Sequence, residues 1–190
     1  MKNTVVIIFS IIFMITKTLC FCQEVENTEK EKKIAYSFFT EYGLGVGGFR
    51  DDGISVEFTG ILVNGISFNQ KRDMIGIGVG CDLYYMVFVQ SYPLFANYRH
   101  YFSSKTDYKP LINIAMGTEL SFWHTHRHSA YPVGGDETPN IQCATGLYTT
   151  IAGGFRRKAL SFTSGLFLKS WELDEFFFRY GVEIKVGYTF

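Results

Sequence analysis

The last thirteen residues of the chain, positions 178–190, read FRYGVEIKVGYTF. Every second residue in this stretch is apolar: Phe178, Tyr180, Val182, Ile184, Val186, Tyr188 and Phe190. The residues between them are Gly, Thr or charged. Alternation with a period of two is typical of a β-strand that has one apolar and one polar face. We therefore expect the chain to end in a strand that runs to its final residue.

The opposite end of the chain has the pattern of an export signal. Lys2 is followed by the apolar run VVIIFSIIFMI at positions 5–15 and then by TKTLCFC. A run of about 11 apolar residues is too short to cross a bilayer as a helix. The pattern predicts a signal peptide over 1–22, cleaved after Cys22, then a short polar leader over 23–34. Lipidation of Cys20 or Cys22 stays open, although neither is preceded by the full bacterial lipobox.

Alternation recurs through the remainder of the chain, which we expect to form a single domain over 35–190. Turn-forming residues separate the alternating stretches. The second stretch slips in phase between Gly60 and Gly65, which predicts a β-bulge there. The sequence thus predicts eight strands, at positions 36–49, 54–68, 75–83, 92–102, 112–122, 141–151, 160–168 and 176–190.

The connections between these strands also alternate in length. The second, fourth and sixth are short and basic or polar, with the sequences NQK, SSKTDYK and FRRK. The third, YYMVFVQS, is longer, and the fifth is a long polar loop over 123–139. Short turns at one end and longer loops at the other are the arrangement of outer-membrane barrels.

An eight-stranded barrel could turn its apolar face inward around a ligand, as lipocalins do, or outward to lipid. Here the polar face is dominated by Gly, Ala and Ser with one or two charges per strand, which suits a narrow lumen. Aromatic residues also gather at strand ends, as membrane interfaces require. The sequence therefore predicts an all-β fold, a closed antiparallel eight-stranded transmembrane up-and-down β-barrel.

Three stretches carry a resemblance to a known family: GIGVGCDLYY, YPLFANYRHYF and YGVEIKVGYTF. They resemble the small outer-membrane β-barrel proteins of Gram-negative bacteria, the group that includes OmpA-type barrels. The resemblance covers nearly all of the mature chain. It implies residence in outer-membrane lipid. It also implies that the assembly machinery of that membrane reads the last strand, where Gly187, Tyr188 and Phe190 match the signal.

Charged residues at inward phase form the most coherent candidate site. The acids are Glu41, Glu57, Asp82, Glu119 and Glu183, and the bases are Arg99, Arg179 and Lys185. Charges in a narrow interior must pair or keep water. We expect a salt-bridge network that closes the lumen, with the lining of a selective pore as the alternative. Arg99 is expected to pair with Asp82 and Glu119, on the two flanking strands.

The stretch WHTHRH is the candidate metal site. His124, His126 and His128 would share one face of a strand, and His-x-His is a zinc spacing. Asp136 and Glu137 are near in sequence, but nothing places them in space, so we expect a polar strand end at the lipid headgroups and no metal or cofactor. Ser129 with His126 or His128 and Asp136 could be imagined as a hydrolytic triad, but closeness in sequence is no evidence of triad geometry.

Cys81 and Cys143 fall at outward phase on the third and sixth strands, which are not neighbours. We therefore expect two small apolar residues rather than a disulfide. The formal net charge is zero, and no basic patch suggests nucleic acid. The expected function is that of a non-enzymatic outer-membrane barrel with a structural or loop-mediated role. A narrow porin-like channel and a lipid-modifying enzyme are the alternatives, and the external partner stays open.

Overall fold

The structure is a computed structural model that describes residues 34–49, 53–85, 89–125, 140–172 and 176–190. The predicted signal peptide over 1–22 and nearly all of the predicted leader over 23–34 lie outside these residues. The described part of the chain forms eight strands: β1 (Ala35–Phe49), β2 (Gly53–Phe68), β3 (Asp73–Tyr84), β4 (Val89–Tyr101), β5 (Tyr108–Thr125), β6 (Asn140–Arg157), β7 (Leu160–Glu172) and β8 (Phe176–Thr189).

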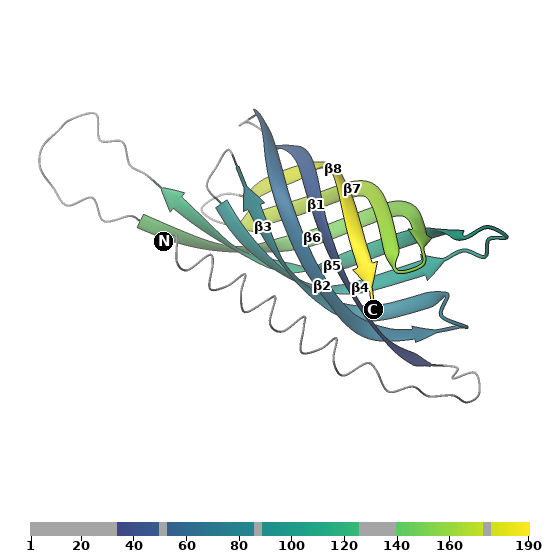
Figure 1. The fold of residues 1–190 in the computed structure, drawn as a ribbon. Helices are drawn as coiled ribbons and strands as arrows, with labels where there is room; N and C mark the ends of the chain where they lie inside the picture. The colour runs from purple at the N-terminus through teal and green to yellow at the C-terminus, as the bar shows by residue number, and fades with distance from the viewer. Residues whose placement is uncertain (1–33, 50–52, 86–88, 126–139, 173–175) are drawn as a thin grey trace, which may run out of the picture. The chain divides into compact units, whose positions relative to one another are not determined.

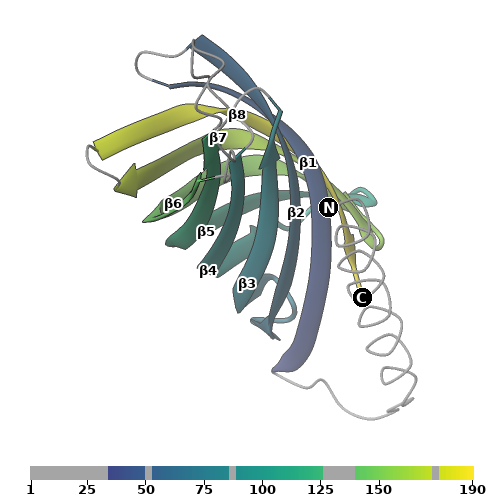
Figure 2. The same ribbon diagram turned by 90° about the vertical axis from the view of Figure 1, so that its left-hand side faces the viewer.

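These strands form one closed antiparallel barrel in which each strand pairs with the next along the chain. The pairing of β1 with β8, from Phe39 opposite Thr189 to Phe49 opposite Arg179, closes the sheet. Figure 1 shows the barrel with its tilted strands, and Figure 2 shows the same barrel turned by 90° about the vertical axis. The described residues contain no helix that is long and apolar enough to span a membrane. The predicted fold class is confirmed.

The two faces of each strand are oriented as the sequence predicts. On β8, Tyr180, Val182 and Ile184 point outward and are half or more exposed, whereas Arg179 and Glu183 are buried inside. The same alternation recurs on β3 and β4. The apolar face is therefore the outer surface of the barrel, and the polar face lines its interior.

The predicted bulge in β2 is wrong. The pairing of β2 with β1 continues without a break from Gly53 to Ser67. The sequence pattern slips because Ile61 and Val63 point into the barrel, where they join an apolar cluster with Phe39, Met74 and Phe95. The inward face of β2 thus changes from polar to apolar along the strand, while the backbone alternation continues without interruption.

Several strands are longer than predicted. Tyr84 ends β3 and Val89 begins β4, so four of the eight residues of the expected loop YYMVFVQS belong to strands. In the same way, β6 continues to Arg157 and β7 to Glu172. Tyr84 and Val89 are buried inside the barrel, because the alternation continues through these aromatic and aliphatic residues.

Glycines on the inward face make room for aromatic rings. A Cβ on Gly78 would lie 2.3 Å from the ring of Phe95, its partner on β4. Gly47 and Gly181 form a pair across the β1–β8 seam, and a Cβ on either would lie 2.6 Å from the ring of Phe167. The ring of Phe167 therefore covers the backbone where the first and last strands meet.

The turn between β2 and β3 is strained and held by side chains. Asn69, Gln70 and Lys71 have φ values of 50°, 58° and 62°, in the left-handed region that disfavours residues with a Cβ. The Asp73 carboxylate accepts a hydrogen bond from Asn69 Nδ2 (2.7 Å). It also accepts one from the Tyr98 hydroxyl (2.8 Å) and lies 2.6 Å from His100 Nδ1. Asp73 thereby ties the turn to β4.

These hydrogen bonds, that from His100 first and then those from Asn69 and Tyr98, lower the pKa of Asp73 to about 2. The stabilisation is complete above the ordinary pKa of the carboxyl, 3.8, and is lost as the pH falls through about 2. We expect Asp73→Asn to lower stability at neutral pH and to remove this acid-dependent loss. Urea unfolding as a function of pH would test this, and an unchanged pH dependence in the variant would contradict it.

Candidate functional site in the barrel interior

Nine charged side chains lie inside the barrel, each no more than 2% exposed. Eight of them are the predicted network residues, and the ninth is Lys169. Each occupies an inward position of its strand, so the strand period places them together. The set contains five acids and four bases: Glu41, Glu57, Asp82, Glu119, Glu183, Arg99, Lys169, Arg179 and Lys185.

Four of these charges lie together toward the loop ends of the strands, in a loop-side ionic cluster of Glu57, Asp82, Lys169 and Arg179. Lys169 Nζ lies 2.9 Å from Glu57 Oε2 and 2.7 Å from Asp82 Oδ2. Arg179 Nη1 also pairs with Glu57 Oε2, and Arg179 Nε donates to the Ser55 hydroxyl (2.9 Å). These contacts join β7 and β8 to β2 and β3 across the interior.

Lys169 is the member of this cluster that sequence reasoning missed. The predicted seventh strand ended at position 168, one residue too early. The signal was nevertheless present, because Lys169 continues the inward series Ser161, Thr163, Gly165 and Phe167. Extending the alternation to the next turn residue would have found it.

A second group, the turn-side ionic cluster, consists of Arg99, Glu41, Asn97 and Asn113. Arg99 Nη2 lies 2.5 Å from Glu41 Oε1, and Arg99 Nε donates to Asn113 Oδ1 (3.1 Å). Asn97 Nδ2 donates to the same oxygen (2.9 Å). The guanidinium lies 3.7 Å from the centre of the Phe39 ring.

The expected pairing of Arg99 with Asp82 and Glu119 is therefore wrong. Arg99 lies near the turn end of β4, whereas Asp82 and Glu119 lie toward the loop ends of β3 and β5. Side chains on neighbouring strands contact each other only where they lie at the same height along the barrel. Arg99 lies at a different height from Asp82 and Glu119. The partner of Arg99 comes instead from β1.

The remaining charges differ in how they are satisfied. Lys185 Nζ lies 2.6 Å from Glu183 Oε1, two residues away on the same strand. Among the described residues, neither oxygen of Glu119 has a hydrogen-bond partner, although this side chain is buried. Asp82 and Glu57 repel the Glu119 carboxylate, while Lys169 and Arg179 attract it. Glu119 is thus the carboxylate that lacks a direct partner in the network.

We expect Glu119→Gln to stabilise the barrel by about 1–3 kcal/mol, because it removes a buried charge that accepts no hydrogen bond. Equilibrium urea unfolding in detergent would measure the change. Glu57→Gln is the matched control, since the same exchange there weakens pairs with Lys169 and Arg179 and should destabilise the protein. Equal losses of stability in the two variants would contradict the assignment of Glu119.

Apolar side chains fill much of the interior beside the charges. A buried cluster contains Phe39, Ile61, Val63, Met74, Phe95, Ala115 and Tyr148. The rings of Phe95 and Tyr148 stack at 5.0 Å, and those of Tyr84 and Trp171 meet edge to face at 5.8 Å. Large side chains from strands that do not pair with each other therefore meet inside the barrel, and the interior is a packed core that contains ionic clusters.

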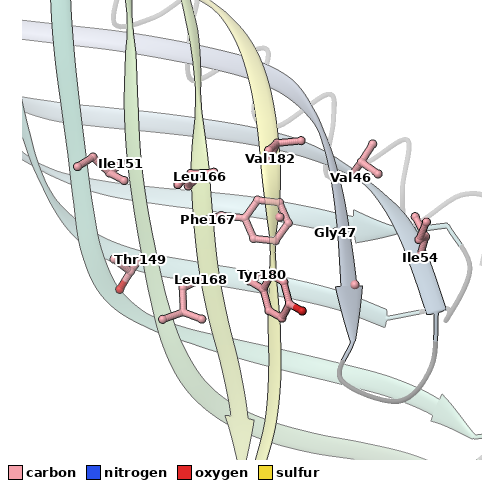
Figure 3. A pocket seen from close by; sticks show the side chains of 12 residues that line it. Val46, Gly47, Ile54, Thr149, Ile151, Leu166, Phe167, Leu168, Tyr180 and Val182 are labelled. Atoms are coloured by element: carbon pink, nitrogen blue, oxygen red, sulfur yellow. The ribbon is translucent and has the colours of Figure 1, made fainter.

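The outer wall carries one apolar groove of about 580 Å³, shown in Figure 3. Outward residues of β1, β2 and β6–β8 form its sides. Gly47, Gly48 and Gly181 line its floor, where the absence of side chains leaves space. The inward ring of Phe167 is reached through these glycines (Figure 3). The lining is mainly apolar, and Thr149 and Tyr180 are its polar side chains.

The other sequence candidates are tested little by the structure. His124 belongs to β5, opposite Ile141, while His126, His128, Ser129 and Asp136 lie outside the described residues. Within the described ranges, no cluster of His, Cys, Asp and Glu is suited to a metal ion. Cys81 and Cys143 are free thiols on β3 and β6. Of the predicted assembly signal, Gly187 points inward and Tyr188 outward.

Comparisons with known proteins agree with this architecture. No protein-family model matches the sequence, and no curated protein sequence matches it significantly. Among solved structures, the chain is similar to the Neisserial surface protein A, with a TM-score of 0.57 and 11% identity over 84% of this chain and 100% of that one.

Two further solved structures are similar. The N-terminal β-barrel domain of OprF from Pseudomonas aeruginosa matches with a TM-score of 0.52 and 11% identity, over 81% of this chain and 97% of that one. Ail, the attachment invasion locus protein of Yersinia pestis, in complex with the heparin analogue sucrose octasulfate, matches with a TM-score of 0.50 and 13% identity. The match covers 82% of this chain and 99% of that one. The chain has the fold of the small outer-membrane β-barrels.

Proposed function

We propose that this protein is an integral barrel of the bacterial outer membrane, exported by its N-terminal signal. Its role is structural or mediated by its loops, and it is neither an enzyme nor a channel. The observation that supports this proposal is that the distribution of polar and apolar side chains is the reverse of that in a water-soluble protein. Ionic groups are buried inside, and large apolar side chains such as Leu44, Ile77, Met116, Leu166 and Ile184 are exposed on every side. A surface of this kind is compatible with lipid rather than water.

The lipid-facing surface is tested by placing a cation on it. Ile184 points outward in the middle of β8, between Val182 and Val186, and lies opposite Leu44 on β1. We expect Ile184→Arg to reduce the free energy of unfolding in phospholipid bilayers by about 2–4 kcal/mol, because the cation enters hydrocarbon near the midplane. Urea titration of the protein in vesicles would measure this.

Leu160 provides the matched control. It also points outward, but it begins β7 at the turn end of the barrel. Arginine near an interface costs only about 0–1 kcal/mol, so Leu160→Arg should be tolerated. Equal effects at the two positions, or a monodisperse protein without detergent or lipid, would contradict the proposal.

The packing of the interior supports a closed barrel over a channel. Arg99, Arg179 and Trp171 are fully buried, and eight strands enclose little more than their own side chains. We expect no steady conductance in planar bilayers. A stable open channel whose ion selectivity changes in Lys169→Met or Glu119→Gln would favour the pore instead.

Biogenesis and external contacts complete the proposal. The alternating C-terminal strand would be read by the outer-membrane assembly machinery, so removal of Phe190 should reduce the amount of folded protein in that membrane. The longest connection between described strands, positions 126–139, is the first segment to test for a partner. A strain that carries the barrel with this connection shortened should show the envelope phenotype of the deletion strain.

A further inference from the structure

Positive charge is concentrated at one end of the barrel. By topology, the β2–β3, β4–β5 and β6–β7 turns lie at the same end. These turns and the adjacent strand ends carry seven bases, which we call the turn-side cation collar: Lys71, Arg72, Lys105, Lys109, Arg156, Arg157 and Lys158. The same segments carry only Asp73 and Asp107 as acids, and Asp73 is already engaged by Asn69, Tyr98 and His100.

An aromatic band on the outer surface lies immediately beside the collar. The ring of Phe155 lies 5.7 Å from that of Tyr108 and 5.6 Å from that of Phe162. All three side chains are exposed on the outer face, and His100 meets Phe102 at 4.7 Å farther along the same end. Aromatic side chains of membrane proteins concentrate at the level of the lipid headgroups.

Arg157 connects the aromatic band to the collar. Its guanidinium lies 5.2 Å from the centre of the Tyr108 ring, its partner across β5 and β6. The side chain is exposed and has the outward phase of Phe155. It is therefore placed beside the aromatic rings on the side toward the turns, where phosphate groups of a surrounding leaflet would lie.

Arg156, the preceding residue, differs in both direction and contacts. It has inward phase, its guanidinium lies 5.2 Å from the ring of the buried Tyr101, and its Nε donates to the Lys158 carbonyl oxygen (2.6 Å). Two adjacent arginines of one turn thus face the barrel mouth and the outer surface respectively. They form a matched pair for experiments.

We propose that the exposed bases of the turn-side cation collar, which exclude the half-buried Arg156, bind the phosphate groups of anionic phospholipids in the leaflet on the turn side. This inference rests on the proposed membrane location. Guanidinium and ammonium groups donate charge-assisted hydrogen bonds to phosphate. Their position beside the aromatic band fits a lipid headgroup, which is held at that level, better than a soluble anion. Lys71, Arg72 and Arg157 are the expected contacts, because all three are exposed and Arg157 lies beside the aromatic band.

The test measures which lipids stay with the protein. The full chain is inserted into nanodiscs of phosphatidylcholine alone or with a minor fraction of phosphatidylglycerol, and retained lipids are counted by native mass spectrometry. Each exposed cation that contacts the headgroups should enrich phosphatidylglycerol by a factor of about 5 at low ionic strength. The enrichment should decrease as salt is added, because the charges are exposed.

Arg157→Gln, alone and with Lys71→Gln and Arg72→Gln, should remove most of the enrichment, whereas Arg156→Gln should keep it. Gel mobility before and after heating identifies the folded barrel in each sample. Folded wild-type barrel without enrichment, or equal retention in the Arg157 and Arg156 variants, would overturn the inference and leave the proposed membrane location intact. Failure of the wild type to insert into either bilayer would overturn both.

Discussion

Replacing Lys169 with methionine is expected to lower the free energy of unfolding by about 3–5 kcal/mol, the cost of breaking a buried ion pair from one side. Lys169 donates to Glu57, Asp82 and the Tyr84 hydroxyl, and it is only 1% exposed. Glu57 would keep Arg179. Asp82 would lose the hydrogen-bond donor that the described residues give it, and its Oδ1 already has none. Urea unfolding in detergent, followed by tryptophan fluorescence, would measure the loss.

Two further variants show whether the loss of stability comes from the Asp82 carboxylate that is left without a cation. Lys169→Met combined with Asp82→Asn removes both the cation and the carboxylate that depends on it, so it should recover part of the stability. Lys109→Met is the control for the exchange itself, because Lys109 is exposed at the turn end, where surface substitutions change stability by about 0.5 kcal/mol or less. A double variant that is no more stable than Lys169→Met would contradict the role of Asp82.

Arg99→Met is expected to cost a similar amount, about 3–5 kcal/mol, because it leaves Glu41 without its cation inside the barrel. Arg99→Lys should restore only part of the loss. A lysine ammonium is a point charge, whereas the guanidinium donates through different nitrogens to Glu41 and to Asn113 and lies 3.7 Å from the centre of the Phe39 ring. The measurement is again equilibrium unfolding.

Double-mutant cycles would identify the partner of Arg99. Arg99→Met with Glu41→Gln should show a coupling energy of about 1–3 kcal/mol, as residues in one hydrogen-bonded network do. Arg99→Met with Asp82→Asn should be additive within about 0.5 kcal/mol, because Asp82 pairs with Lys169. Strong coupling to Asp82 and none to Glu41 would contradict the structure.

The strand pattern could be predicted from the sequence because the two faces of a barrel wall lie in different environments. Leu44, Ile77 and Val182 alternate with Gly or charged residues, and period two needs no tertiary information to be recognised. The prediction failed where one environment changes along a strand. Ile61 and Val63 are apolar and inward, so their chemistry resembles that of the outer face, and a bulge was predicted where the backbone is regular.

Which charges face inward could be predicted, but which of them meet could not. The phase of Arg99 is a local property of its strand, whereas its pairing with Glu41 joins β4 to β1 across the interior and depends on strand tilt and register. The unsatisfied position of Glu119 depends on the same geometry. Only the pair of Glu183 with Lys185, two residues apart on one face, lies within reach of sequence reasoning.

The loop-side ionic cluster also bears on the order in which the barrel forms. Its acids, Glu57 and Asp82, come from the first half of the chain, and its bases, Lys169 and Arg179, come from the last two strands. The cations are thus separated from Glu57 by more than a hundred residues, and contacts of such high sequence separation form late and slowly. Until β7 and β8 arrive, an unfinished sheet carries two uncompensated carboxylates on the face that will become its interior. Electrostatic neutralisation of that face therefore coincides with closure of the ring, so an incomplete chain remains open to water and accessible to chaperones and proteases.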